Sequence, residues 1–135
     1  VGIVNGDDSF CDLVTAGHIC RLEKFGLKEG NDLRAVDLQL VKKPGELGVA
    51  FKTRGLLQME AEVTTPGRFS VYNALTAMAI CRHFKVSNEN IRIALLAAKV
   101  KGRIEMIKVS EDFTLLIDYA HNAMFSRPCK GIAGI

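Results

Sequence analysis

The sequence predicts an α/β fold, in which core strands and helices accompany a three-stranded antiparallel meander. Between residues 36 and 64, apolar and polar residues alternate along three consecutive segments, as expected of strands with one solvated face. The apolar spacing then changes to the i, i+3, i+4 pattern of a helix, starting at Val71. A chain of 135 residues is long enough to bury one hydrophobic core, so we expect one main domain.

The amino-terminal part predicts short elements. Residues 1–4 are an apolar strand that stops at the motif N-G-D-D of residues 5–8. A helix reaching about residue 16 is expected next, capped by one of three short polar side chains, Asp7, Asp8 or Ser9. Gly17 would end this helix, and residues 21–25 predict a second short strand.

The meander is the clearest prediction. Turns are expected at K-P-G, residues 43–45, and at Arg54-Gly55, because glycine and proline interrupt the alternation there. Each strand should present one apolar face, formed by Val36, Leu38 and Leu40, then by Leu47, Val49 and Phe51, then by Leu57, Met59, Ala61 and Val63.

Two helices and two further strands complete the chain. The first helix should end near Phe84 and bury Val71, Ala74, Leu75, Met78 and Cys81. The second should begin at Ser87, an N-cap residue, and bury Ile91, Ala94, Leu95 and Ala98. Strands are then predicted at residues 104–109 and 113–117. Residues 124–135 show no periodicity and predict an irregular tail.

Composition excludes several classes of function. The net charge of +3, without basic residues interleaved with aromatic ones, argues against nucleic acid as a partner. No apolar stretch approaches about 18 residues, so we expect no membrane span. The four cysteines form no C-x-x-C pair and have no histidine at zinc-ligand spacing, so no metal site is expected. A reduced, cytoplasmic protein is the simplest interpretation, and a first residue other than methionine hints at an internal fragment.

Polar residues follow the last predicted strand. The motif D-Y-A-H, residues 118–121, comes directly after the apolar run of residues 113–117. Ligands bind at the carboxyl ends of strands in open α/β sheets. Asp118 could accept hydrogen bonds from two ribose hydroxyls, although it could also be a turn residue, and His121 could be purely structural.

Two more motifs could contact a nucleotide. Gly67 and Asn73 open the helix that follows the meander, and an asparagine amide can match the N6/N7 edge of adenine. An ordinary capped helix is the alternative. The guanidinium of Arg103 suits phosphate oxygens, and Glu105 could orient it. A surface ion pair is the alternative for these two residues.

Taken in order, the motifs resemble those of the Mur ligase superfamily. The pattern is N-x-D-D, then G-x-F-N-x-x-N-x-L-x-A, then G-R-x-E, then D-Y-A-H, and it covers residues 1–123. The tyrosine of the last motif and the stretch D-L-R-A, residues 32–35, are most similar to the MurE type. The resemblance implies the later half of a central, ATP-binding domain. It also implies a cytoplasmic ligase of peptidoglycan precursor and cell-wall synthesis, which adds the third stem-peptide residue to UDP-MurNAc-L-Ala-D-Glu.

Position by position, the resemblance also implies nucleotide contacts. Asn73 matches the asparagine on adenine, Arg103 the arginine on the ATP phosphates, Asp118 the acid on the ribose, and His121 the histidine beside the nucleotide. ATP and Mg²⁺ are the implied cofactors, and UDP-MurNAc-dipeptide is the implied second partner. The family's metal ligands and carbamoylated lysine would lie upstream of Val1, so we expect neither metal-binding nor catalytic residues within this chain.

The sequence departs from the family in two respects. Ser70 replaces the first asparagine of F-N-x-x-N, and no G-x-x-G-K-[ST] phosphate loop is present. By itself the chain is therefore expected to be inactive. A related ligase of the folylpolyglutamate or cyanophycin synthetase type, or a non-catalytic nucleotide- or partner-binding module, remains an alternative. The sequence does not choose between diaminopimelate and lysine as the added residue.

Overall fold

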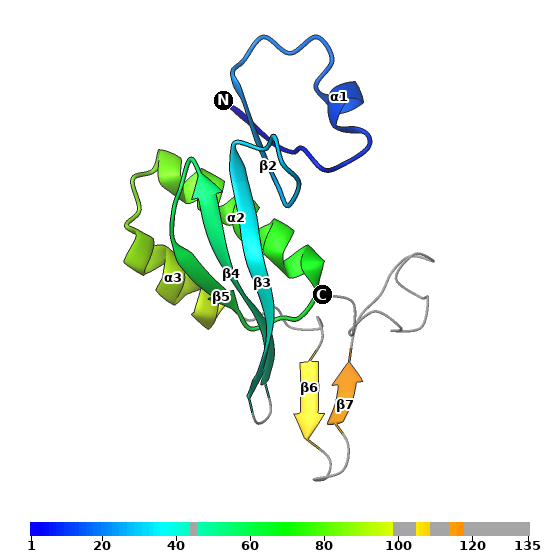
Figure 1. Cartoon of the computed structure of the whole chain (residues 1–135), viewed down its shortest axis with the longest axis vertical. Coiled ribbons are helices and arrows are strands. Elements are labelled where there is room, and N and C mark those ends of the chain that lie inside the picture. Colours follow the sequence, from blue (N-terminus) through cyan, green and yellow to red (C-terminus); the bar gives the residue numbers. More distant parts are fainter. Residues whose placement is uncertain (44–45, 99–104, 109–113, 118–135) are drawn as a thin grey trace.

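A five-stranded mixed sheet is the centre of the fold. The computed structural model describes residues 1–43, 46–98, 105–108 and 114–117. The strands follow chain order across the sheet, β1-β2-β3-β4-β5 (Figure 1). The first three strands are parallel, and β3, β4 and β5 are antiparallel. This arrangement confirms the predicted α/β class and the predicted meander.

The parallel part is built from short strands. β1 (Gly2–Asn5) pairs along its whole length with β2 (Leu22–Gly26), and the chain between them passes through the short helix α1 (Cys11–Val14). The last residues of β2, Phe25 and Gly26, pair with the start of β3. The carboxyl ends of β1 and β2 therefore lie at the same edge of the sheet, as in other parallel sheets.

The first helix differs from its prediction. It has only four residues, its N-cap position is Phe10, and no side chain caps it. The Asp8 carboxylate does accept a local hydrogen bond, from the backbone N–H of Phe10 at 2.8 Å. The Asp7 carboxylate is engaged in the contacts described below, so this residue does not act as the cap.

The meander contains a bulge, and its strands differ in length from the prediction, since the first two are longer and the third is shorter. It consists of β3 (Leu33–Lys43), β4 (Glu46–Gly55) and β5 (Glu60–Val63). The register shifts between Val36 and Gln39, where Asp37 has a φ of 56°. Before the bulge Leu33 and Ala35 are buried, whereas Leu38 packs against the core after it. The predicted alternation from residue 36 was therefore right only for the distal half of β3.

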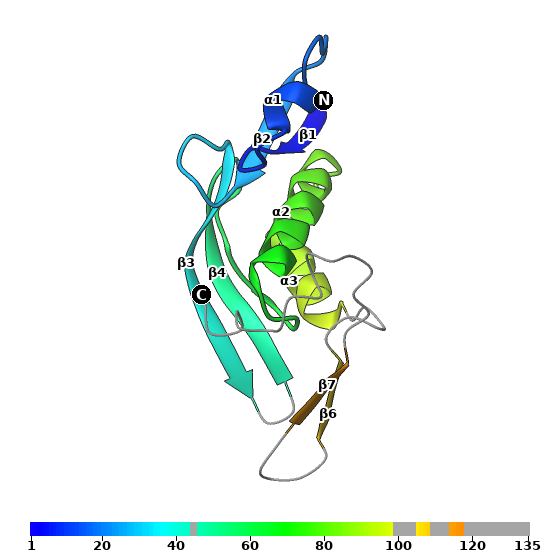
Figure 2. The ribbon, with the colours of Figure 1, turned by 90° about the vertical axis from the view of Figure 1, so that its right-hand side faces the viewer.

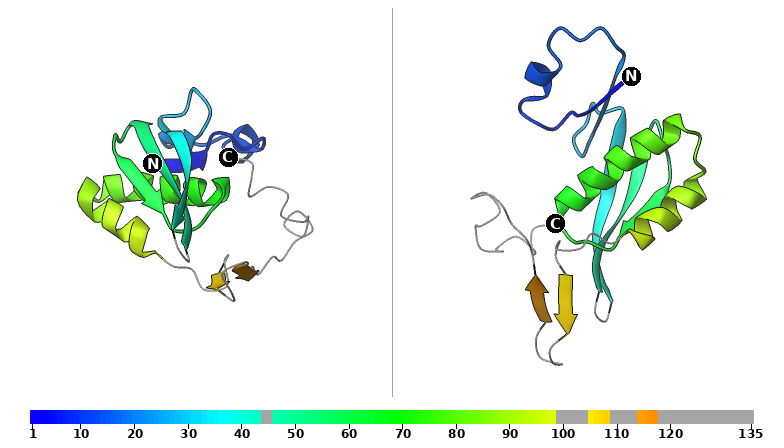
Figure 3. Two further views of the ribbon diagram at one scale, coloured as in Figure 1. Left: turned by 60° about the horizontal axis from the view of Figure 1, so that its bottom comes forward. Right: turned by 180° about the vertical axis from the view of Figure 1, so that it is seen from behind.

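Helices α2 (Arg68–His83) and α3 (Asn88–Ala97) cover one face of the sheet, as Figure 2 and the rear view in Figure 3 show. The Ser87 hydroxyl caps α3 as predicted, by accepting a hydrogen bond from the N–H of Asn90 at 3.3 Å. Of the residues predicted to face inward on α3, Ile91 is buried but Ala94 and Ala98 are exposed. No helix in the described part of the chain is long and apolar enough to cross a membrane.

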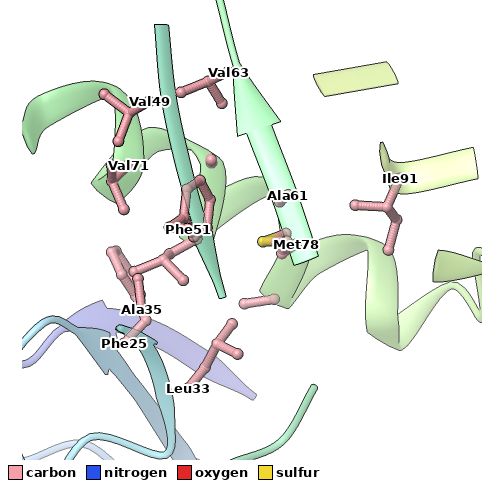
Figure 4. Packing of buried hydrophobic residues seen from close by; sticks show 13 residues of the cluster. Phe25, Leu33, Ala35, Val49, Phe51, Ala61, Val63, Val71, Met78 and Ile91 are labelled. Atoms are coloured by element: carbon pink, nitrogen blue, oxygen red, sulfur yellow. The ribbon is translucent and has the colours of Figure 1, made fainter. Parts of the chain in front are cut away.

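The core lies between the sheet and α2. Figure 4 shows Phe51 and Val49 of β4 beside Val71 and Met78 of α2. Leu33, Leu75, Met78, Val49 and Val71 are the largest fully buried side chains. The predicted stripe of α2 is confirmed, except that Cys81 is half-buried and Ala79 is buried instead. Cys81 still packs against the edge of the core cluster.

A separate two-stranded sheet contains the last two predicted strands. β6 (Glu105–Lys108) pairs antiparallel with β7 (Thr114–Ile117), with Glu105 opposite Ile117. The predicted tail of residues 124–135 lies outside the described residues.

Candidate functional site

The carboxylate of Asp7 joins three segments at the carboxyl ends of β1 and β2. It lies in the loop after β1 and contacts the loop after β2 and the first turns of α2. Its Oδ2 accepts hydrogen bonds from the backbone N–H of Leu27 at 2.6 Å and from the Tyr72 hydroxyl at 2.8 Å. Its Oδ1 accepts one from the Asn31 amide at 2.8 Å. We call this group of Asp7, Leu27, Asn31 and Tyr72 the Asp7 junction.

The contacts of the junction change the protonation of its acidic groups. Burial would raise the pKa of Asp7, but the hydrogen bonds from Leu27, Tyr72, Asn31 and Lys28 outweigh burial and lower it. Burial and the neighbouring Asp7 carboxylate raise the pKa of Tyr72 to about 12. At neutral pH the junction therefore joins an ionised carboxylate to a neutral phenol, which gives a charge-assisted hydrogen bond.

Two glycines leave room for the junction. A Cβ on Gly26 would lie 2.6 Å from both the Asp7 Cγ and the Asn31 Nδ2. A Cβ on Gly6 would overlap the Oδ1 of Asn31. The Oδ1 of Asn5 also fixes the loop, since it accepts a hydrogen bond from the N–H of Asp7 at 3.0 Å. The N-G-D-D motif therefore forms the turn that its residue types favour, but it provides a tertiary anchor instead of a helix cap.

Asn73, the predicted adenine contact, is exposed in the second turn of α2. It directly follows Tyr72, whose hydroxyl is tied to Asp7. The helix starts after Gly67, which has a φ of 97°, and no side chain caps it. Ser70 is buried and donates its hydroxyl to the Gly67 carbonyl at 2.6 Å, so its side chain is engaged within its own turn. The structure thus leaves Asn73 available to a ligand.

The other predicted contacts lie outside the described residues. These are Arg103, Asp118 and His121. β7 ends at Ile117, directly before Asp118, so the strand that was predicted to carry the acid is present. The structure therefore does not test whether these three residues lie near Asn73.

Among the described residues, no three histidine, cysteine, aspartate or glutamate side chains are grouped so as to hold a metal ion. The expectation that the family's metal ligands lie upstream of Val1 stays a prediction.

Sequence reasoning missed the part played by Tyr72. The tyrosine falls between two positions of the predicted motif, and its distance of 65 residues from Asp7 hides the contact. One signal was available, because both Asp7 and Tyr72 belong to motifs that flank predicted elements. Pairing those motifs in space required the parallel β1-β2 register, which periodicity does not supply.

A parallel sheet edge lined with polar loops, beside a helix that begins directly after a glycine, is typical of α/β domains that bind ligands. The Mur ligase middle domain family matches residues 1–81, which is more than half of the chain. The chain belongs to this family, as its motifs indicated.

Relatives agree with this assignment. The UDP-N-acetylmuramoyl-L-alanyl-D-glutamate–2,6-diaminopimelate ligase of Alkaliphilus oremlandii is 39% identical over 99 residues, which are 72% of this chain and 20% of that protein. The ligase of the same name from Caldanaerobacter subterraneus subsp. tengcongensis is 31% identical over 121 residues, 88% of this chain and 24% of that protein. The chain thus spans about a quarter or less of these two relatives.

Solved structures agree as well. A crystal structure of MurF from Acinetobacter baumannii has a TM-score of 0.76 and 26% sequence identity, and the match covers 93% of this chain and 27% of that chain. The predicted fold, part of a Mur ligase central domain, is therefore confirmed.

Proposed function

We propose that residues 1–123 are part of the central domain of an ATP-dependent ligase of peptidoglycan precursor synthesis. The full-length enzyme would add the third stem-peptide residue to UDP-MurNAc-L-Ala-D-Glu. The observation that carries this proposal is the similarity to diaminopimelate-adding ligases over most of the chain, with 39% identity in one of them. These relatives are named as diaminopimelate ligases, which favours diaminopimelate over lysine as the added residue. The free cysteines Cys11, Cys20 and Cys81 fit a reducing compartment, so the cytoplasm is the proposed location.

Four residues of this chain are proposed to hold ATP. The exposed Asn73 amide would contact adenine, because it can donate and accept hydrogen bonds at one base edge. The Arg103 fork would bind phosphate oxygens, Asp118 would accept the ribose hydroxyls, and His121 would lie beside the nucleotide.

The chemistry follows from the family resemblance. The substrate carboxylate takes the terminal phosphoryl group of ATP and releases ADP, and the incoming amine then displaces phosphate from the acyl phosphate, losing one proton. The residues of this chain would bind and orient the nucleotide for the first of these steps. Mg²⁺ would be held by residues upstream of this chain, as the family resemblance implies.

Phosphate release by the full-length parent tests the proposal. We expect release to require ATP, Mg²⁺, UDP-MurNAc-L-Ala-D-Glu and diaminopimelate together, and lysine to replace diaminopimelate poorly. In the matched variant Arg103→Lys the rate should fall about 10²- to 10³-fold, because a lysine loses the planar fork that stabilises developing charge. Release that depends instead on a folate and glutamate, or no release with any acceptor, would contradict the proposal in favour of the related ligase or of a non-catalytic module.

A further inference from the structure

The Asp7 junction lies next to the helical position that is proposed to read the adenine. Tyr72 directly precedes Asn73 in α2. The Tyr72 hydroxyl donates a hydrogen bond to Asp7, in the loop after β1. Successive residues on a helix point about 100° apart, so a fixed Tyr72 side chain sets the direction of Asn73. Tyr72 is half-buried whereas Asn73 is exposed, as this geometry requires.

The junction is built from rigid parts. Asp7 receives backbone hydrogen bonds from both Leu27 and Lys28, so the loop after β2 holds the carboxylate in place. The Asn31 amide bridges the Oδ1 of Asp7 and the carbonyl of Lys28, at 2.8 and 3.0 Å. These contacts leave the carboxylate little freedom, and Tyr72 is the residue of the junction that comes from α2.

The beginning of α2 needs such an external contact. No side chain caps the helix, and its first turn contains no acidic residue. The Ser70 hydroxyl acts only within its own turn. The Tyr72 hydroxyl therefore ties the first turns of α2 to the ends of β1 and β2 through a polar bond that does not depend on the apolar core.

We propose that Tyr72 is a positioning residue for nucleotide recognition, which acts through its hydrogen bond to Asp7 to aim Asn73 at the base of ATP. This inference rests on the proposed function, because it takes Asn73 as the adenine contact. It goes beyond that proposal, since it assigns base selectivity to a residue that touches no ligand. Removing the bond should weaken discrimination between bases more than it weakens the fold.

The test is the dissociation constant of the full-length parent for ATP and for ITP, measured by calorimetry. ITP lacks the N6 amino group that an asparagine would read. Tyr72→Phe keeps the aromatic ring and removes only the hydroxyl. We expect its preference for ATP over ITP to fall about 3- to 10-fold, the range expected when an indirect contact loses part of a hydrogen bond.

A hydroxyl deletion on the same helix provides the control. Thr76 donates its hydroxyl to the Tyr72 carbonyl at 2.9 Å, within α2, and forms no bond to the loops in the described structure. Thr76→Val should leave the ATP/ITP ratio at the wild-type value. Asp7→Ala, which removes the acceptor oxygens, is the second variant. Combining it with Tyr72→Phe should lower the ratio no further than the larger single effect, because both substitutions remove the same hydrogen bond.

The outcomes separate the two proposals. A wild-type parent that binds ATP and ITP equally, or neither, would overturn the adenine contact and this inference with it. A selective wild-type parent with an unchanged ATP/ITP ratio in Tyr72→Phe and in Asp7→Ala would overturn this inference alone. In that case Tyr72 would only stabilise the fold, and the melting temperature would fall without any change in selectivity.

Discussion

The Glu23 carboxylate lies 2.5 Å from the Arg82 guanidinium, and its side chain is only 4% exposed. The ring of His83 lies 2.9 Å from the same oxygen. This group joins the middle of β2 to the last turn of α2, whereas the Asp7 junction joins the loops to the first turns of that helix. Two polar contacts thus fix the two ends of α2 against the parallel strands.

Glu23→Gln should destabilise the protein. The amide keeps the shape of the side chain but leaves the partly buried Arg82 without its counter-charge, and breaking a buried pair costs about 3 to 5 kcal/mol. Because Arg82 is 28% exposed, we expect the lower end of that range or somewhat less. Urea unfolding measures the loss, and Glu89→Gln, at an exposed pair with Arg92, is the matched control with little effect. If both variants lost the same free energy of unfolding, burial of Glu23 would not explain the effect.

Acid should destabilise the protein through the same carboxylate. The hydrogen bond from Arg82 lowers the pKa of Glu23 below its ordinary value of 4.5. A lowered pKa in the folded state contributes stability above pH 4.5, and this contribution is lost as the pH falls through the folded value. Asp7 acts in the same direction from an ordinary value of 3.8. Between neutral pH and about pH 3, the free energy of unfolding should therefore fall more steeply with decreasing pH for wild type than for Glu23→Gln. If the free energies of wild type and Glu23→Gln fell in parallel, Glu23 would not contribute to this acid sensitivity.

Tyr72 should titrate late in alkali. Its pKa is raised to about 12 from an ordinary value of 10.0, first by burial and then by the hydrogen bond and charge of Asp7. Its contribution to stability is present below pH 10.0 and is lost as the pH rises through the folded value. In an alkaline titration followed by tyrosinate absorbance, Tyr72 should ionise at an unusually high pH. This step should be absent from Tyr72→Phe and should occur at a lower pH in Asp7→Asn. If a step at this high pH persisted in Tyr72→Phe, it would belong to the second tyrosine, Tyr119, and the assignment to Tyr72 would be wrong.

Gly6→Ala should be destabilising for a steric reason. The added Cβ would overlap the Oδ1 of Asn31 and come within 3.1 Å of the Lys24 Cβ. Overpacking of this kind costs about 1 to 3 kcal/mol. In an Asn31→Ala background the obstructing amide is absent, so the same substitution should cost less, as a double-mutant cycle in urea would show. Equal costs in both backgrounds would exclude the clash as the cause.

Much of the fold follows from local pattern. The meander and α2 were predicted because alternation and helical spacing are strong signals there, and the N-cap Ser87 was predicted from its residue type. The bulge at Asp37 was not, because it depends on pairing with β4 rather than on local preference. The short α1 also departed from its prediction, since Asp7 is engaged in tertiary contacts instead of capping.

The candidate site could be predicted only in part from the sequence. Asn73 could be proposed because its motif is local to one helix; its side chain is exposed, and its contact with adenine stays a prediction. The Asp7 junction could not, since its members are separated by up to 65 residues and meet only through the parallel register. Arg103, Asp118 and His121 stay predictions from the motifs alone.

Asp118 offers the sharpest remaining test of those motifs. If it accepts the ribose hydroxyls, Asp118→Asn in the full-length parent should weaken ATP binding by about 1.5 to 3 kcal/mol, the range for a hydrogen bond to a charged group. The variant should also discriminate less between ATP and 2′- or 3′-deoxy-ATP, because a missing hydroxyl is most costly where it leaves a carboxylate unpaired. Calorimetric titration with the three nucleotides measures both effects, and thermal unfolding checks that the fold is retained. A sharp fall in melting temperature with unchanged ribose discrimination would instead identify Asp118 as a structural residue at the end of β7.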